Sequence, residues 1–294
     1  MIVRFLGTSA GELYPGIWCR CQHCQRAREG EEKNRRRSAA LYIETESAPE
    51  GAGILIDFPS EIVSQAWRHG VDLPGLRTLL VTHSHGDHWF PYQLRWRCRP
   101  TAMSRPGEVA PYDARGPRQT EIPLLHVFGN ASVEAILRRE LGDDLEPFAI
   151  VFHAIRPEDT FPAGGFTVTA LPAHHDVGRE EAVHYVLQAE DRTILYGLDG
   201  DTFLPGTRER LRAFRFDLVI MEATFGLGDG GNHRNFERLI AEAQWLREEG
   251  RMKVNGRIVA THFSPHYSPP HAETSDYLLR HDILAAWDGM EVRL

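Results

Sequence analysis

The chain has 294 residues, of which 42% are hydrophobic and 25% are charged, and its formal net charge is -8. A chain of this size and composition can bury a large core, so we expect a single domain over residues 1–294. The negative net charge argues against nucleic acid as a partner, because phosphate contacts dominate such affinity. No apolar run approaches the ~20 residues of a membrane span and the amino terminus is unlike a secretory leader, so we expect a cytoplasmic protein with no membrane partner.

The first part of the chain is predicted to form one β-sheet. Apolar and β-branched runs predict strands over 2–6, 39–45, 53–58 and 77–82, and a helix over 62–69 lies between the last two. Asp57 ends the third of these strands. It either hydrogen-bonds a metal-binding histidine or serves as a simple turn carboxylate, and the sequence does not separate the two roles.

A cysteine cluster follows the first predicted strand. Cys19, Cys21 and Cys24 have the spacing C-x-C-x-x-C, which supplies three thiolates. A structural zinc needs four ligands, so a fourth must come from elsewhere. Three free buried thiols are the alternative, whereas disulfide pairing is not favoured for so few cysteines in a reducing compartment.

Four side chains that bind metals lie within six positions directly after the strand predicted at 77–82. They are His83, His85, Asp87 and His88. The carboxyl ends of strands are where α/β sheets place their sites, and imidazole with carboxylate suits zinc, manganese or iron. A histidine-rich surface loop is the alternative. It is disfavoured because polar groups this close to a core strand need partners.

Residues 95–118 form an unusual segment in which arginines and prolines recur. The segment contains six arginines but only two acidic residues, and four prolines interrupt it. A loop of this length in a compact domain is usually functional or disordered. We therefore treat about 97–122 as an insertion that forms a lid or a homodimer contact. Its arginines, Arg97 among them, could bind a phosphate, and a solvated basic surface is the equal alternative.

The remaining elements are predicted to complete a second sheet and its helices. We expect a helix over 132–141 with Ser132 as its N-cap, and helices over 236–248 and 274–287. Strands are expected over 149–153, 166–171, 184–189, 193–196, 217–221 and 257–261. Three of them lead to further candidate ligands. These are His175 with His174 as its rival, Asp199 with Asp201 as its rival, and His262.

The pattern His83-x-His85-x-Asp87-His88, followed in order by these later candidates, resembles the signature of the metallo-β-lactamase superfamily. The resemblance covers nearly the whole chain. It implies an α/β fold, the four-layer αββα sandwich, with a dinuclear metal site along one edge. In such a site two cations lower the pKa of a shared water, so that hydroxide becomes the nucleophile near neutral pH.

The same resemblance implies the role of each ligand. His83, His85 and His175 would hold one zinc or manganese ion, and Asp199 would bridge to a second. Asp87, here also a catalytic residue, His88 and His262 would hold that second ion.

The cysteine cluster is similar to that of one subgroup, the phosphoribosyl cyclic phosphate phosphodiesterases of phosphonate breakdown. This similarity implies one structural zinc, with His266 as the fourth ligand. The subgroup places that histidine three residues after the last catalytic histidine, whereas Pro265 makes the gap four here. His23 and His271 therefore remain candidates. The zinc would hold the 11–16 loop against the loop that carries His262.

A glycine-rich loop before the helix predicted at 236–248 contains Asn-His233-Arg234. It resembles the superfamily's Asn-His loop, which implies that His233 is the acid that protonates the leaving group and that Arg234 contacts phosphate. A polar helix cap is the alternative for His233.

These motifs together predict a metal-dependent hydrolase, and a phosphodiesterase acting on a small, cyclic or otherwise phosphorylated substrate fits them best. Three alternatives share the fold. They are a lactonase or carboxylic ester hydrolase, a tRNA 3′-processing nuclease, and a protein similar to one of quinone-cofactor biosynthesis. The nuclease is disfavoured because no long glycine-rich arm is present, and the last because its kind tends to lack an intact metal motif.

Overall fold

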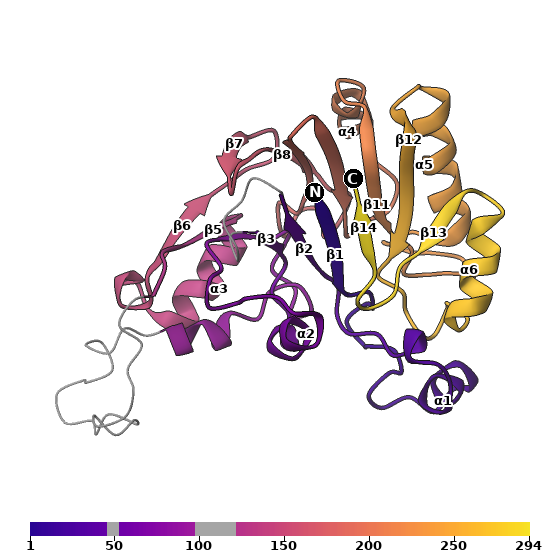
Figure 1. The fold of residues 1–294 in the computed structure, drawn as a ribbon, viewed down its shortest axis with the longest axis horizontal. Helices are drawn as coiled ribbons and strands as arrows, with labels where there is room; N and C mark the ends of the chain where they lie inside the picture. Colours follow the sequence, from indigo (N-terminus) through magenta and orange to yellow (C-terminus); the bar gives the residue numbers. More distant parts are fainter. Residues whose placement is uncertain (46–52, 98–121) are drawn as a thin grey trace.

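The computed structural model describes residues 1–45, 53–97 and 122–294. These residues form two seven-stranded sheets that pack face to face, with helices on the outer faces (Figure 1). The strand orders are β14-β1-β2-β3-β4-β5-β6 and β13-β12-β11-β10-β9-β8-β7. The predicted four-layer αββα sandwich is therefore confirmed.

The first sheet combines antiparallel and parallel pairs. Its strands are β1 (Ile2–Gly7), β2 (Ala40–Glu44), β3 (Ile54–Ile56), β4 (Thr78–Leu80), β5 (Leu125–Gly129), β6 (Ile150–Ala154) and β14 (Glu291–Arg293). Strands β14, β1, β2 and β3 pair antiparallel, whereas β3 to β6 run parallel. Because β14 adds to β1, the last strand of the chain completes the sheet in which the chain begins.

The second sheet has the same mixed character. Its strands are β7 (Thr160–Ala163), β8 (Phe166–Pro172), β9 (Val183–Ala189), β10 (Arg192–Gly197), β11 (Phe216–Glu222), β12 (Met252–Thr261) and β13 (Ile283–Ala285). Strands β7 to β10 pair antiparallel and β10 to β13 run parallel. The parallel strands of both sheets therefore send their carboxyl ends to defined edges, where side chains can converge.

Six α-helices lie among the described residues, and they cover the outer faces or follow the loops. They are α1 (Gln22–Glu29), α2 (Ile62–His69), α3 (Ala131–Leu141), α4 (Pro205–Leu211), α5 (Phe236–Glu248) and α6 (His271–Leu279). Short 3-10 segments span Glu32–Asn34, Pro91–Arg97 and Glu146–Phe148. The core has three layers, one between the sheets, one under α2 and α3, and one under α4, α5 and α6.

Three of the sequence predictions about the fold are wrong in detail. The strand predicted at 149–153 is β6 of the first sheet rather than part of the second, because it pairs parallel with β5, which the sequence did not predict. The N-cap of α3 is Asn130 rather than Ser132, since the Asn130 side chain accepts from the amides of Ser132 and Val133. The helix predicted over 274–287 ends at Leu279, and β13 follows because it pairs with β12.

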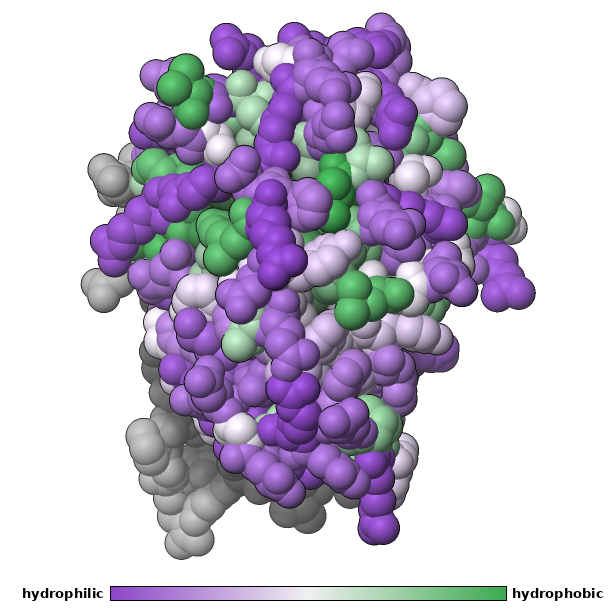
Figure 2. All heavy atoms as spheres, turned by 90° about the vertical axis from the view of Figure 1, so that its right-hand side faces the viewer, coloured by the Kyte–Doolittle hydropathy of each residue, from purple (hydrophilic) through white to green (hydrophobic). Residues whose placement is uncertain are grey.

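The outer surface on the α5 and α6 side is mostly hydrophilic, with apolar residues scattered singly, as Figure 2 shows. In the part of the chain that the structure describes, no helix combines the length and apolarity that spanning a membrane requires. The Arg/Pro-rich insertion predicted at about 97–122 lies outside the described residues apart from its two ends. Its predicted role as a lid or dimer contact stays a prediction.

Candidate metal centre

The structure brings the seven predicted ligands together at one edge of the sandwich. Four follow β4, and one each follows β8, β10 and β12. They form two groups, in each of which the candidate ligand atoms lie within 4.8 Å of one another. The groups are His83, His85 and His175, and Asp87, His88, Asp199 and His262.

The structure also separates the predicted ligands from their rivals. His175 and Asp199 belong to these groups, whereas His174 and Asp201 do not. Asp201 instead pairs with the guanidinium of Arg238 at 2.7 Å.

The first group has the spacing expected around a metal ion. His85 Nδ1 lies 3.2 Å from His175 Nε2, and two ligands of a tetrahedral zinc at ~2.0–2.1 Å are ~3.3 Å apart. The Nε2 atom of His83 is buried and has no hydrogen-bond partner among the described residues. A buried polar atom without a partner is costly, so this geometry fits a bound cation.

Asp199 connects the two groups. Its Oδ2 lies 3.3 Å from His88 Nε2 and its Oδ1 lies 3.3 Å from His262 Nε2, while Oδ2 is 3.8 Å from His83 Nε2. The two Nε2 atoms of His88 and His262 are 3.2 Å apart. Asp87 Oδ2 lies 3.5 Å from each of them. A carboxylate in contact with both groups fits the expected bridging position.

Hydrogen bonds on the far side of the rings fix which nitrogen faces the centre. His88 Nδ1 donates to Asp57 Oδ2 at 2.8 Å, so the predicted hydrogen bond between Asp57 and a histidine of the cluster is confirmed. The Thr82 hydroxyl donates to Asp57 and accepts from His83 Nδ1 at 3.0 Å. Each ring therefore presents the Nε2 lone pair that a metal requires.

His262 is oriented in the same way by a residue that the sequence analysis missed. The Thr224 hydroxyl donates to the Glu222 carboxylate and accepts from His262 Nδ1 at 2.8 Å. His85 differs, because its Nδ1 faces the centre and its Nε2 lies 3.5 Å from Asp176.

The charge states suit cation binding. Burial lowers the pKa of His83 well below its usual range, and the neighbouring charge of His88 lowers it further, so the ring is neutral. Burial acts to raise the pKa of Asp199, but the charges of His262 and His88 outweigh it and hold that pKa well below its ordinary value. Burial acts to lower the pKa of His88, but the charges of Asp199, Asp87 and Asp57 raise it well above its usual range, and a bound cation would replace the proton that this ring holds. Imidazoles and ionised carboxylates are the ligands that zinc and manganese take, so this ligand set fits two divalent cations.

His233 lies beside the centre on the loop that follows β11. Its ring centroid is 5.0 Å from that of His175 and 5.9 Å from that of His262. Burial would lower its pKa, but the hydrogen bond from its Nδ1 to Glu222, at 2.9 Å, and the Glu222 charge raise the pKa to about 9. The ring therefore carries a proton at neutral pH and can act as an acid.

Glu222 is the main functional residue that sequence reasoning missed. Its side chain is fully buried and accepts from the backbone amides of Gly200, Thr224 and Arg234 as well as from His233. Glu222 thus connects three parts of the site, namely the loop that carries Asp199, the Thr224 hydroxyl that orients His262, and His233. The signal was present, because Glu222 ends β11 as Asp199 follows β10.

Arg234 and Arg97 are not placed at the centre by any described contact. Arg234 is fully buried, donates to the carbonyl of Gly200 at 3.0 Å and lies over the Phe203 ring at 4.7 Å. In this position the guanidinium supports the Asp199 loop and does not face solvent, and the phosphate contact stays a prediction. Arg97 donates to the carbonyl of Pro123, and burial lowers its pKa to about 10, so its phosphate contact stays a prediction.

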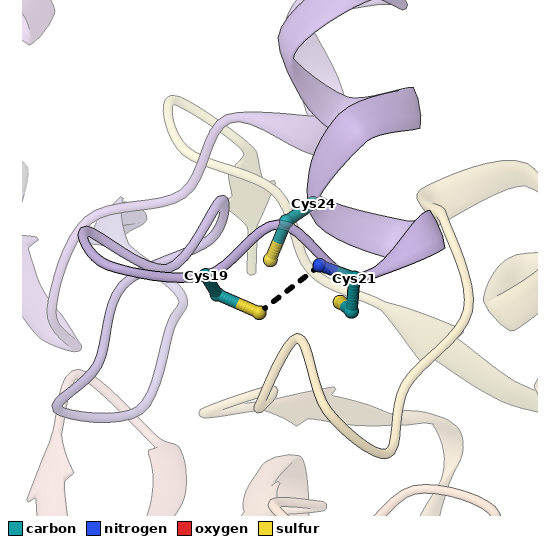
Figure 3. Close-up of side chains that lie close together, drawn as sticks. All are labelled: Cys19, Cys21 and Cys24. Carbon is teal, nitrogen blue, oxygen red and sulfur yellow. Dashed lines mark hydrogen bonds between the residues drawn. The ribbon is translucent and has the colours of Figure 1, made fainter.

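The cysteine cluster lies in the loop before α1 and at its start (Figure 3). The three Sγ atoms are within 4.8 Å of one another. The amide of Cys21 donates to Cys19 Sγ at 3.4 Å, and the amide of Gly16 donates to Cys24 Sγ at 3.3 Å. Burial raises the pKa of Cys24 to about 12, so without a cation this sulfur stays a neutral thiol.

Of the three candidates for a fourth ligand, His266 has a ring nitrogen next to a thiol, with Nδ1 3.9 Å from Cys19 Sγ. His23 Nδ1 lies 3.0 Å from the carbonyl of Pro265, and His271 Nδ1 accepts from Arg36 at 3.1 Å. Sulfur and nitrogen ligands of one zinc are ~3.6 Å apart, so His266 is near the distance expected from Cys19. The group of mutually close ligand atoms holds the three cysteines without His266, so the fourth ligand stays a prediction.

Comparison with protein families gives one decisive match. Residues 53–263 match the family described as a beta-lactamase superfamily domain, which is more than half of the chain. The chain belongs to the beta-lactamase superfamily. Membership places it among metal-dependent hydrolases, and the two ligand groups fit that class. A sequence comparison of this superfamily member with curated proteins gives no match.

Solved structures similar to this superfamily member share its fold over almost the full length. A diphosphatase from the PhnP family is 20% identical, with a TM-score of 0.74 over 99% of this chain and 96% of that one. Zn(2+)-bound PqqB from Methylobacterium extorquens is 17% identical, with a TM-score of 0.73 over the whole of both chains. The short form of human tRNase Z is 20% identical, with a TM-score of 0.64 over 100% and 99%.

Proposed function

We propose that this protein is a metal-dependent hydrolase that cleaves a small phosphodiester, cyclic phosphates included. The observation that carries the proposal is the contact of Asp199 with both ligand groups, beside the ring of His233, which is hydrogen-bonded to Glu222. The likeness to a PhnP-family diphosphatase supports phosphorus chemistry over carboxylic ester hydrolysis. When bound, two divalent cations would supply Lewis acidity and lower the pKa of water toward neutrality.

The ligands divide between the two cations as their groups suggest. His83, His85 and His175 would hold one, and Asp87, His88 and His262 would hold the other, with Asp199 shared. Hydrogen bonds from His83, His88 and His262 to Thr82, Asp57 and Thr224 keep these rings in place. The positions are therefore set by the protein before a substrate arrives.

His233 would supply the proton that the leaving oxygen needs. Glu222 accepts from its Nδ1 and keeps the ring cationic, so the ring can donate at neutral pH and regain a proton afterwards. The side chain of His233 is 16% exposed, which leaves a path for that proton from solvent.

The cysteine cluster would hold one structural zinc through Cys19, Cys21, Cys24 and His266. The zinc would join the loop before α1 to the segment after β12. The backbone already links these two segments through Ala10 and Phe263 at 3.2 Å. Binding of a structural zinc contributes on the order of 10 kcal/mol to ordering such a segment.

Metal content and substrate class test the proposal. The purified protein is expected to hold about three divalent ions, of which two exchange for manganese, whereas a carrier with only the cysteine site would hold one. It is expected to hydrolyse bis-p-nitrophenyl phosphate faster than a simple lactone. Faster lactone turnover would favour a carboxylic ester hydrolase, and absence of both activities in the fully loaded protein would contradict hydrolysis.

A further inference from the structure

A second cavity opens between the two sheets, away from the metal centre. Its volume is about 690 Å³, and it is lined by residues of β4 to β8 and of the β7–β8 turn. Thr78 begins β4 and Gly165 precedes β8, whereas the metal ligands follow the other ends of these strands. The length of β8 alone separates the two sites by about 20 Å. In Figure 1 the β7–β8 hairpin lies at the upper left, beside β6.

A stack of three rings and a fourth ring beside it form one wall of this cavity. Phe161, Phe128 and His153 stack with centroid separations of 5.0 and 4.4 Å and interplanar angles of 11° and 13°. His126 lies edge to edge with His153, with a centroid separation of 5.2 Å and an interplanar angle of 28°. The stack crosses from β7 of the second sheet to β5 and β6 of the first. Both sheets therefore fix its orientation, and its aromatic faces favour a further flat ring as a neighbour.

The two histidines of this wall are hydrogen-bonded to each other. His126 Nδ1 and His153 Nε2 are 2.9 Å apart, so one nitrogen donates and the other accepts. Burial, together with the charge that His126 would carry, lowers the pKa of His153, which favours the neutral form of that ring. In either tautomeric arrangement a neutral pair leaves one N–H donor and one lone pair on its remaining nitrogens.

The chemistry of the lining limits what can bind. The cavity residues are Thr78, His126, Phe128, His153, Phe161, Pro162, Ala163, Gly164, Gly165, Phe166 and Thr167, and none of them carries a fixed charge. Among the described residues that line it, a phosphate or carboxylate would meet no cation. Mostly apolar walls with a few polar groups and a volume of several hundred Å³ are typical of small-molecule sites.

We propose that this cavity binds an uncharged, flat aromatic molecule with hydrogen-bond donors and acceptors at its edge, such as a nucleobase. The ligand ring lies along the aromatic wall, and its edge exchanges hydrogen bonds with the His126–His153 pair. The site is separate from the metal centre and does not depend on the reaction catalysed there.

Adenine, which is uncharged and flat, is the probe for this site. Titration of the full-length protein, followed by calorimetry, is expected to show saturable binding. Benzoate, which is flat but charged, and cyclohexanecarboxamide, which is neutral but not flat, are expected to bind at least about tenfold more weakly. Equal binding of all three probes, or no saturable binding of adenine, would overturn the proposal.

Variants locate the bound adenine. His153→Phe keeps the ring stack but removes the nitrogens, and it is expected to weaken adenine binding about tenfold through a lost hydrogen bond. The matched control His281→Phe changes an exposed histidine on the other sheet's side and should bind adenine normally. Asp199→Ala should also bind normally. Binding lost in Asp199→Ala but retained in His153→Phe would place adenine at the metal centre and contradict the inference.

A direct measurement covers the case in which His153→Phe does not fold. Nuclear magnetic resonance of the wild-type protein with ¹⁵N-labelled histidine reports each ring separately. Adenine is expected to shift the ring signals of His126 and His153 and to leave that of His281 in place. Unchanged His126 and His153 signals at saturating adenine would overturn the proposal.

Discussion

The metal centre and the cysteine cluster gather their ligands in different ways. The centre takes seven side chains from the ends of four strands in both sheets. Its first ligand in the sequence is His83 and its last is His262. The cluster takes three cysteines from six consecutive residues and one candidate from the segment after β12. The centre therefore depends on strand register, whereas the cluster depends on a short loop.

The two regions also differ in what supports their ligands. At the centre, Asp57, Thr82 and Thr224 hold the far nitrogens of three rings. In the cluster the recorded donors to sulfur are the backbone amides of Gly16 and Cys21. Side-chain hydrogen bonds therefore orient the ligands of the centre, whereas backbone amides hold two described sulfurs of the cluster.

The largest expected effect comes from the carboxylate shared by both ligand groups. Asp199→Ala should lower kcat/KM by more than ~10⁴-fold, beyond the cost of losing an acid-base group, because cation binding is lost as well. Metal analysis alongside kinetics checks this. Asp201→Ala is the matched control, and it should retain its metal because Asp201 pairs with Arg238. A fully loaded Asp199→Ala protein would contradict the bridging role.

The second largest effect is expected for His233, the proposed acid. His233→Ala should slow phosphodiesters with poor leaving groups by ~10²–10⁴-fold and activated nitrophenyl esters far less, because only the former need a proton. Steady-state rates over a leaving-group series measure the difference. Equal slowing across the series would remove His233 from the acid role.

A supporting residue of the centre should matter less than a ligand. Asp57→Asn weakens the hydrogen bond to His88 Nδ1 and is expected to reduce metal affinity or activity by ~10–100-fold. Competition with a chelator measures the affinity. An unchanged affinity would show that the ring keeps its position without this carboxylate.

The cluster should affect stability more than rate. Cys24→Ser is expected to remove about one zinc per chain, leave the two other ions in place and lower kcat/KM only several-fold, because the 11–16 loop loses its tether near the catalytic edge. Proteolysis should cut this loop faster than in the wild type. Loss of all metal would mean that the two regions are not independent.

The smallest expected effect is a pH dependence of stability at Asp288. This buried carboxyl accepts hydrogen bonds from Thr8 and Arg37. Burial raises its pKa to about 6, against hydrogen bonds from the Arg37 amide and the Thr8 hydroxyl. The folded state therefore favours the protonated acid. This contribution is full below pH ~4 and is lost as pH rises through about 6. Chemical denaturation across that range should show the slope, and Asp288→Asn should flatten it.

The sequence predicted those parts of the molecule that local pattern determines. Most strands, the motif after β4 and the cysteine spacing could be read directly, because buried strands and ligand spacing leave periodic or clustered signals. Strand β5 was missed because it follows directly after the 97–122 insertion. Strand β6 was assigned to the wrong sheet because pairing partners are not visible in a single strand.

The site shows the same limit. Histidines and aspartates at strand ends were predicted, whereas Glu222 and Thr224 were missed, since a carboxylate and a hydroxyl become informative only once their partners are known. Arg234 shows the converse. Its place beside His233 indicated a phosphate contact, but its guanidinium turns inward to the Gly200 carbonyl.

Because four ligands follow β4 of one sheet and the other three follow strands of the second, cations bound there fasten the two halves of the sandwich to each other. Separating the halves then requires release of the ions. The midpoint of thermal unfolding should consequently climb with free metal concentration, by about 2.7 kcal/mol of added stability per site at a hundredfold excess over its Kd. Metal supply would in this way set the lifetime of the protein as well as its turnover.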